Sequence, residues 1–131
     1  MNVFIDTSAI FALLDADDDN NSRAMKIWKE LISQQSTLVS TNYVMIELFT
    51  LLHGRLGLAA ARMFQENVFP LISVRWIDES FHHAGVAAVL AAGRKKLSLV
   101  DCVSFDVMRH LGIRTAFSFD RHFREQGFDC L

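Results

Sequence analysis

The chain has 131 residues, of which 51% are hydrophobic and eleven are Phe, so it can bury a sizeable core as a single domain over residues 1–131. One Pro and six Gly exclude a linker-rich or disordered protein. Thirteen basic and fifteen acidic residues give a net charge of −2, which excludes a global basic field for binding nucleic acid. Any contact with nucleic acid must therefore come from a local patch.

Neither the cysteines nor the apolar segments indicate secretion or a membrane. Cys102 and Cys130 have no metal-type spacing, which favours reduced thiols in a cytoplasmic protein. The first apolar segment lacks a basic leader and is interrupted by Asp6, so we expect no signal peptide. The run from Ala84 to Ala92 is far shorter than the about 18–20 apolar residues that a membrane span needs.

Hydrophobic periodicity predicts alternating strands and helices in the first half of the chain. The expected strands are 3–5 and 37–41, and the expected helices are 9–14, 22–35, 42–52 and 58–67, with an acidic loop at 15–21 and a break at 54–57. Ser22 is the expected N-cap of the second helix. The helix over 42–52 is apolar almost all round, which predicts burial on more than one face.

The alternation continues in the second half. The expected strands are 71–77, 114–119 and 128–130, and the expected helices are one from Asp78 to Gly93, one from Ser98 to Leu111 and a short one from Asp120. An Ala-rich stretch in the first of these helices allows close packing against a neighbour. The overall order predicts an α/β fold, with a parallel central sheet covered by helices on both faces.

Four acidic residues are candidates for one site: Asp6, Glu47, Asp101 and Asp120. Helix capping is an alternative for the three aspartates, because Asp is a favoured N-cap. For Asp101 the alternative is specific, since Ser98 three residues earlier completes a capping-box pattern.

Glu47 is the acid that capping does not explain. It lies in the middle of an apolar helix, and no Lys or Arg lies within one turn of it. A buried ionised carboxylate must be paired, bound to a metal or neutralised. A metal is therefore one explanation and a long-range salt bridge is the other.

The predicted positions of the four acids converge. Asp6 and Asp120 follow strands and Asp101 lies in the first turn of a helix. Glu47 lies about one turn into the helix that follows the second strand. In a parallel sheet these points share one edge, where clustered carboxylates repel one another unless a cation lies between them. Oxygen ligands favour Mg²⁺ or Mn²⁺, which can activate water and stabilise charge on a phosphate.

The histidines suggest no competing site. They show no HExxH spacing, so we interpret them as surface or structural residues: His82, His83, His110 and His122.

Four segments carry a resemblance to a known family. They are Phe4-Ile5-Asp6-Thr7-Ser8, Thr41-Asn42-Tyr43-Val44-Met45-Ile46-Glu47-Leu48, Leu97-Ser98-Leu99-Val100-Asp101-Cys102 and Phe117-Ser118-Phe119-Asp120-Arg121-His122-Phe123. In this order they resemble the PIN domains, most closely the VapC-like ribonuclease toxins of bacterial type II toxin–antitoxin systems.

The resemblance implies a three-layer α/β/α fold and a Mg²⁺- or Mn²⁺-dependent endoribonuclease that cleaves RNA. It implies a homodimer inhibited by a cognate antitoxin. It assigns the metal site to the four acids and supporting polar roles to Thr7, Ser98 and Ser118. The family often has Thr in place of Ser118, which keeps a hydroxyl, and a small residue in place of Cys102, which concerns packing.

A basic cluster and three rival functions complete the hypotheses. Arg94, Lys95 and Lys96 either bind flanking phosphates of the RNA or cap a helix. A phosphohydrolase needs a second Asp where Ser8 stands. A receiver domain needs paired acids after the first strand, and a PIN module that binds RNA without catalysis is the remaining alternative.

Overall fold

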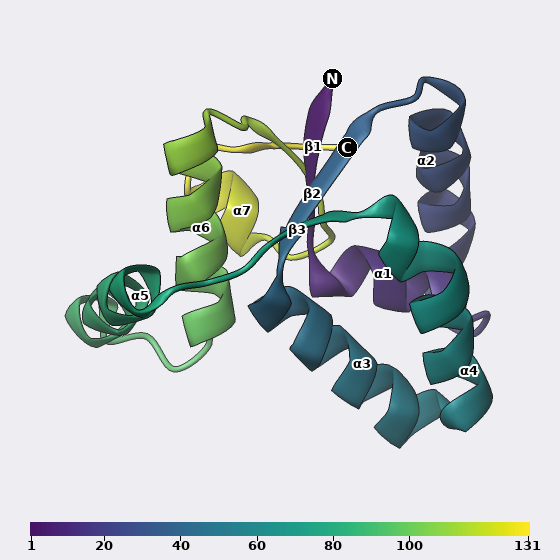
Figure 1. Ribbon diagram of the computed structural model, residues 1–131, viewed down its shortest axis with the longest axis horizontal. Coiled ribbons are helices and arrows are strands. Elements are labelled where there is room, and N and C mark those ends of the chain that lie inside the picture. Colours follow the sequence, from purple (N-terminus) through teal and green to yellow (C-terminus); the bar gives the residue numbers. More distant parts are fainter.

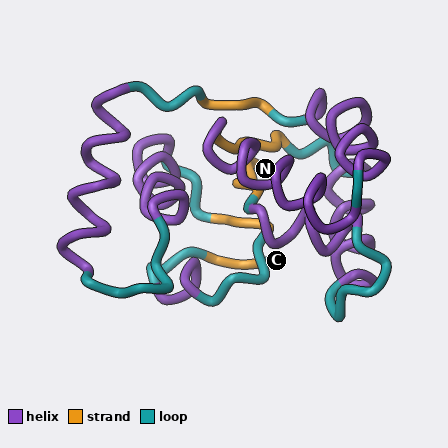
Figure 2. Tube along the Cα trace, turned by 90° about the horizontal axis from the view of Figure 1, so that it is seen from below, coloured by secondary structure: helices purple, strands orange, loops and turns teal.

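The computed structural model describes all 131 residues and shows a five-stranded parallel sheet between two layers of helices (Figures 1 and 2). The strands are β1 (Asn2–Ile5), β2 (Thr37–Thr41), β3 (Ser73–Arg75), β4 (Thr115–Phe117) and β5 (Asp129–Cys130). The predicted α/β/α fold with a parallel central sheet is confirmed.

Two groups of helices cover the sheet. One layer contains α1 (Thr7–Leu14), α2 (Asn21–Ser33), α3 (Asn42–Leu56) and α4 (Leu58–Met63), and the other contains α5 (Glu79–Ala92), α6 (Leu99–Leu111) and α7 (His122–Glu125) (Figure 1). The chain continues from α4 through a π-helical turn, η1 (Phe64–Val68), and a 3₁₀ turn, η2 (Phe69–Leu71). None of the helices has both the length and the apolar character that crossing a membrane requires.

The strand order is β3-β2-β1-β4-β5, with β1 in the centre. The chain builds the sheet outward from β1 to β3 on one side and then returns to place β4 on the other side of β1. Val3, Phe4 and Ile5 are completely buried, as expected for a central strand covered on both faces. The strand order therefore reverses between β1 and β4, and in open parallel sheets a crevice for ligands forms at such a point.

Three predicted strands are shorter than the sequence suggested, and the last of them, predicted over 128–130, lacks only Phe128. The third covers Ser73–Arg75 instead of 71–77, because Pro70 lies in the 3₁₀ turn and the Ile77 N–H donates to Asn42 Oδ1 (2.7 Å) instead of a strand. The fourth covers Thr115–Phe117 instead of 114–119, because the Phe119 N–H donates to Ser8 Oγ (2.9 Å).

Helix ends also differ from the prediction. The second helix begins at Asn21, not at Ser22, and the Asn21 side chain bonds to the carbonyl oxygens of the preceding helix. The third continues through Gly54 and ends at Leu56, and its C-cap is Gly57, whose φ of 98° favours glycine. The predicted helix over 58–67 changes to π geometry at Phe64. The last helix begins at His122, after a turn in which Asp120 accepts the His122 N–H (2.9 Å).

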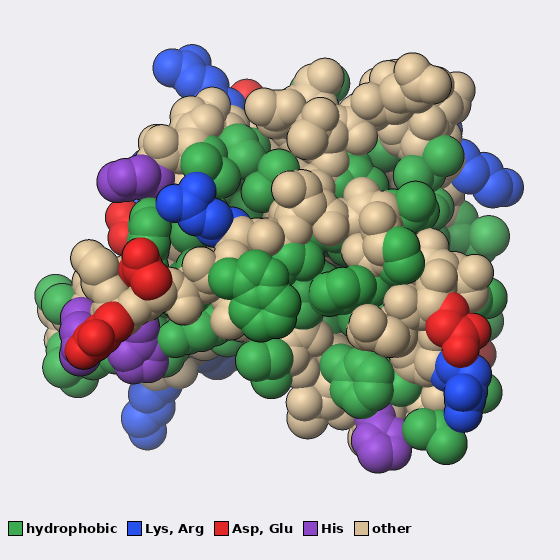
Figure 3. Space-filling model, in the orientation of Figure 1, with side chains coloured by type: hydrophobic (Ala, Val, Ile, Leu, Met, Phe, Trp, Pro, Cys, Tyr) green, Lys and Arg blue, Asp and Glu red, His purple; other side chains and the backbone are tan.

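The prediction that α3 is buried on more than one face is wrong. Its residues Ile46 and Phe49 are 62% and 38% exposed. They line a groove of about 260 Å³ together with Trp76, and Figure 3 shows apolar side chains gathered on this side of the molecule. Apolar residues on this face cover no core, so the helix pattern alone overstated the burial.

Candidate active site

The candidate site lies in the crevice between the ends of β1 and β4. The Asp6 N–H donates to the Phe117 carbonyl (3.1 Å), so the chain leaves both strands at the same level. Beyond this bond, the segment from Ser118 to Asp120 turns over the start of α1. Residues more than a hundred positions apart thus form one wall.

Asp6 is buried, and hydroxyl groups hold its side chain. Its Oδ2 accepts hydrogen bonds from Ser8 Oγ (2.7 Å) and Ser118 Oγ (2.9 Å), and the Ser8 N–H lies 3.4 Å away. No protein group bonds to Oδ1. The N-cap interpretation of Asp6 is thus correct, yet one carboxylate oxygen stays available for a ligand.

The electrostatic environment disfavours an ionised Asp6. The pKa of Asp6 is raised to about 6, and burial is the largest cause. Within this value, the hydrogen bonds from Ser8 and Ser118 lower the pKa of Asp6, and the charges of Asp101 and Asp120 raise it. A cation between the carboxylates would remove this penalty.

Asp101 caps its own helix as the Ser98 spacing predicted. The Ser98 hydroxyl accepts the Asp101 N–H (3.1 Å), and Asp101 Oδ2 accepts the Ser98 N–H (3.2 Å). Burial raises the pKa of the Asp101 carboxyl, the capping bond lowers it, and Asp120 raises it. The cap therefore orients Asp101 and leaves it within reach of the other acids.

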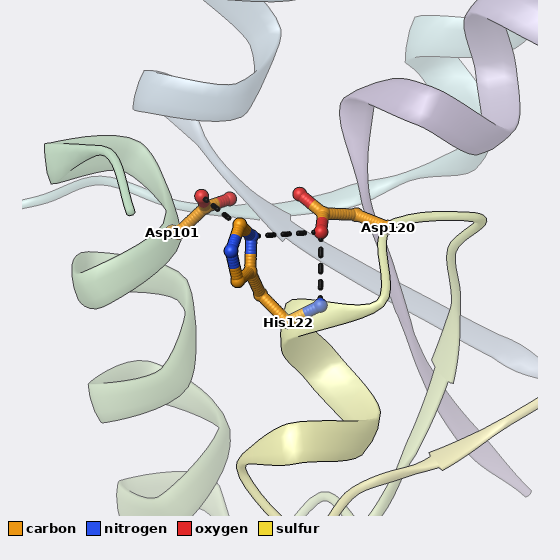
Figure 4. Close-up of side chains that lie close together, drawn as sticks. All are labelled: Asp101, Asp120 and His122. Atoms are coloured by element: carbon orange, nitrogen blue, oxygen red, sulfur yellow. Dashed lines mark hydrogen bonds and ion pairs between the residues drawn. The ribbon is translucent and has the colours of Figure 1, made fainter. Parts of the chain in front are cut away.

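Asp120 and Asp101 enclose a buried histidine (Figure 4). His122 Nδ1 lies 2.9 Å from Asp120 Oδ1 and 3.9 Å from Asp101 Oδ2. Neither ring nitrogen makes an aligned hydrogen bond, so these are ion-pair distances only. One ligand atom from each of the three residues lies within 4.8 Å of the others, an arrangement that could hold a metal ion.

His122 is the main site residue that the sequence pattern did not identify. The pattern assigns it to the surface or to a structural role, but it is only 6% exposed and belongs to the acidic cluster. Its position two residues after Asp120 is the signal that could have identified it. Ser8 was also missed, and its adjacency to Asp6 and Thr7 was the corresponding signal.

Glu47 reaches the site from α3, whereas Asp101 reaches it from α6. It is half-buried, which corrects the expectation that it is a buried charge. It makes no salt bridge, so the alternative of a long-range pairing with Arg or Lys does not hold. Its place in the site follows from the pocket it lines.

One pocket of about 310 Å³ brings the four predicted acids together. The only guanidinium group in its lining is that of Arg55. Five carboxylates line the same pocket: those of Asp6, Asp18, Glu47, Asp101 and Asp120. The tight cluster of Asp101, Asp120 and His122 contains neither Asp6 nor Glu47, and His122 does not itself line the pocket.

The other predicted residues divide into two groups. Thr7 lines the pocket and Ser118 bonds to Asp6, whereas Ser98 acts on Asp101 from outside the pocket. The basic cluster is absent from the lining of this pocket. Arg94 instead donates two hydrogen bonds of 3.2 Å to Glu125, and Lys95 and Lys96 lie exposed in a turn.

The donor set suits a divalent cation. Of the four buried side-chain polar atoms without a hydrogen-bond partner, three belong to Thr7 and His122 at this site. Unpaired buried polar atoms are rare in folded proteins. Here they lie beside carboxyl groups whose ionised form is disfavoured by burial and by neighbouring negative charges. Carboxylate oxygens with an imidazole nitrogen match Mn²⁺, and the oxygens alone match Mg²⁺.

Comparison with known proteins defines the class. The family model of the PIN domain matches residues 3–129, and the chain therefore belongs to the PIN domain family. It is 30% identical over 127 residues to VapC20, a 23S rRNA-specific endonuclease of two Mycobacterium tuberculosis strains. That match covers 96% of this chain and 95% of VapC20.

Solved structures agree with this assignment. The crystal structure of M. tuberculosis VapC20, a sarcin–ricin loop cleaving toxin, superimposes with a TM-score of 0.85 over 96% of this chain and 95% of that chain. FitAcB from Neisseria gonorrhoeae gives a TM-score of 0.69 at 16% identity, covering all of this chain and 96% of that one. The second likeness concerns the fold alone.

Proposed function

We propose that this protein is a metal-dependent endoribonuclease and the toxin of a type II toxin–antitoxin system. The observation that carries the proposal is the pocket in which Asp6, Glu47, Asp101 and Asp120 meet. Membership of the PIN family and the likeness to VapC20 support the same activity. The proposed location is the cytoplasm, where the RNA is.

Asp6, Asp101, Glu47 and Asp120 are the proposed ligands of a Mg²⁺ or Mn²⁺ ion. When bound, such an ion supplies an activated water and stabilises negative charge on the phosphate. Asp6 offers its unpaired Oδ1, while the Ser8 and Ser118 hydroxyls fix its Oδ2. The Ser98 cap fixes Asp101. The His122 N–H donates to Asp120 Oδ1, and the His122 ring lies against the same oxygen. The chain thereby orients its carboxylates before the substrate arrives.

The substrate is RNA, and we propose that it is bound as an exposed loop or single strand. An A-form duplex hides its base edges in a narrow groove, whereas a loop can enter a pocket. Because VapC20 is a sarcin–ricin loop cleaving toxin, an oligonucleotide of that 23S rRNA loop is the first substrate to test.

The partners that the family implies are a second copy and an antitoxin. We propose that the second copy covers the exposed apolar groove on α3. Monomeric proteins seldom expose a large contiguous apolar patch. Light scattering tests it. A monomeric mass at all concentrations would exclude the dimer without affecting the nuclease proposal.

RNA cleavage by the purified chain tests the activity. We expect cleavage with Mg²⁺ or Mn²⁺, none with EDTA, and a loss of at least about 100-fold in Asp6→Asn and Glu47→Gln. Glu30→Gln, which changes an exposed acid on α2 that does not line the pocket, is the control. Binding of RNA without cleavage under any metal would favour the alternative, a PIN-fold RNA-binding or regulatory module.

Expression in bacteria tests the biological role. We expect growth arrest that the product of a neighbouring small gene relieves. Growth arrest by Asp6→Asn as strong as that by the wild type would contradict the proposal.

A further inference from the structure

A second pocket, of about 220 Å³, adjoins the acidic one. Both are lined by Asn20, Phe119 and Asp120, so the two pockets share a wall. The balance of charge differs between them. The only carboxylate in the second pocket is that of Asp120. Three guanidinium groups line it: those of Arg23, Arg121 and Arg124.

Two of these arginines lack a carboxylate partner. Arg121 lies 3.7 Å from Glu125, but neither Arg23 nor Arg124 makes a salt bridge. Arg23 only approaches a backbone carbonyl at the end of the chain (3.5 Å) and stacks over the Phe119 ring (5.7 Å to the centroid). Arg124 contacts the Cys130 thiol, which lines the same pocket. No carboxylate neutralises either guanidinium group, so both can bind an anion.

The two arginines come from separate elements, α2 and α7, and meet only in the folded chain. Guanidinium groups bind phosphate oxygens through paired, charge-assisted hydrogen bonds. A protein with a net charge of −2 needs such a local patch to hold RNA beside a pocket lined by acids. The half-exposed ring of Phe119 forms the wall that a strand would cross between the pockets.

We propose that Arg23 and Arg124 form a subsite for an RNA phosphate adjacent to the scissile one, with Phe119 between this subsite and the acidic pocket. This inference rests on the proposed nuclease function and names the residues that hold its substrate. It assigns phosphate binding to these two arginines instead of Lys95 and Lys96, which line neither pocket.

Steady-state cleavage kinetics test the subsite. In Arg23→Ala/Arg124→Ala we expect KM to rise about 10- to 100-fold with kcat nearly unchanged, because neither guanidinium group lines the acidic pocket. Arg23→Lys/Arg124→Lys should restore part of the affinity. Lys95→Ala/Lys96→Ala removes the same charge from an exposed turn and should change KM little.

The dependence on salt gives a second readout. For a single-stranded RNA, the slope of log affinity against log salt should become shallower by about 0.7 for each phosphate that the variant no longer neutralises. If KM rises as much in Lys95→Ala/Lys96→Ala as in Arg23→Ala/Arg124→Ala, the effect is one of general charge and the subsite is overturned. An unchanged KM in the arginine variant would also overturn it.

Fluorescence anisotropy with labelled RNA in EDTA separates this inference from the proposed function. If the wild type binds RNA through the arginine pair but cleaves none with any metal, the nuclease proposal fails and the subsite stands. If cleavage occurs and binding is indifferent to the pair, the subsite fails alone. Thermal unfolding checks that each variant is folded, as expected for substitutions of exposed side chains.

Discussion

His122 Nδ1 lies 2.9 Å from Asp120 Oδ1, and the same carboxylate oxygen accepts the His122 N–H. Both the side chain and the backbone of His122 thus contact Asp120 at the edge of the sheet. This geometry makes His122 a positioning residue for Asp120, or a ligand itself when the ring faces a cation.

Removing the His122 ring should weaken metal binding. Loss of a partner that orients a ligand typically costs about 10- to 100-fold in metal affinity, so we expect that loss in His122→Ala. Calorimetric titration with Mn²⁺ measures it. His83→Ala, which changes a side chain that is 71% exposed on α5, is the control. Equal affinities in all three proteins would remove His122 from the site.

Asp6 should make stability depend on pH. Its pKa is about 6 in the folded chain and 3.8 when unfolded, so between these values the folded state holds more protons. Stability therefore falls as pH rises through this window, by at most about 3 kcal/mol, and stays low above it.

Urea unfolding in EDTA across this window tests the effect. Asp6→Asn should match the wild type near the unfolded pKa and become the more stable protein near neutral pH, because the amide cannot ionise. A difference between the two proteins that does not change with pH would contradict the prediction.

A bound cation should offset this penalty. We expect Mg²⁺ or Mn²⁺ to raise the midpoint of thermal unfolding, with a gain of about 2.7 kcal/mol at 100 times the dissociation constant. The gain should be greater near neutral pH than below the pKa of Asp6, since protons compete with the metal.

Asp101→Asn provides the comparison for that metal effect. It also loses part of the helix cap, so only the increment on adding metal is compared with the wild type. An increment as large in Asp101→Asn as in the wild type would place the cation elsewhere.

Two glycines should respond oppositely to the same substitution. A Cβ at Gly85 would lie 2.5 Å from Val103 Cγ2, where α5 packs closely on α6. Gly85→Ala should destabilise the protein by about 1 kcal/mol, because overpacking exceeds the gain in helix propensity. Gly54→Ala, in α3 with nothing nearby, should stabilise it by about 0.5–1 kcal/mol. Urea denaturation checks both, and equal signs would be inconsistent with this packing.

Sequence by itself determined the alternation of strands and helices, and it located acidic residues at the carboxyl ends of strands and near the starts of helices. These features depend on local periodicity and capping, as the Ser98–Asp101 box shows, and they recur in the structure with shifts of a few residues. Four of the five acids that line the pocket were found in this way, and Asp18, in the predicted acidic loop, was not. Glu47 lies in the predicted place, although the half-exposed face of α3 contradicts the burial that was expected of it.

Tertiary structure alone decided which side chains surround those acids. The reversal of strand order between β1 and β4 joins Ser118 to Asp6 across 112 positions of sequence. The burial of His122 and the shared pocket of Arg23 and Arg124 likewise depend on elements that are distant in sequence. Local patterns encode which face of an element is apolar, but contacts between distant elements depend on the free energy of the whole fold, and no single segment specifies them.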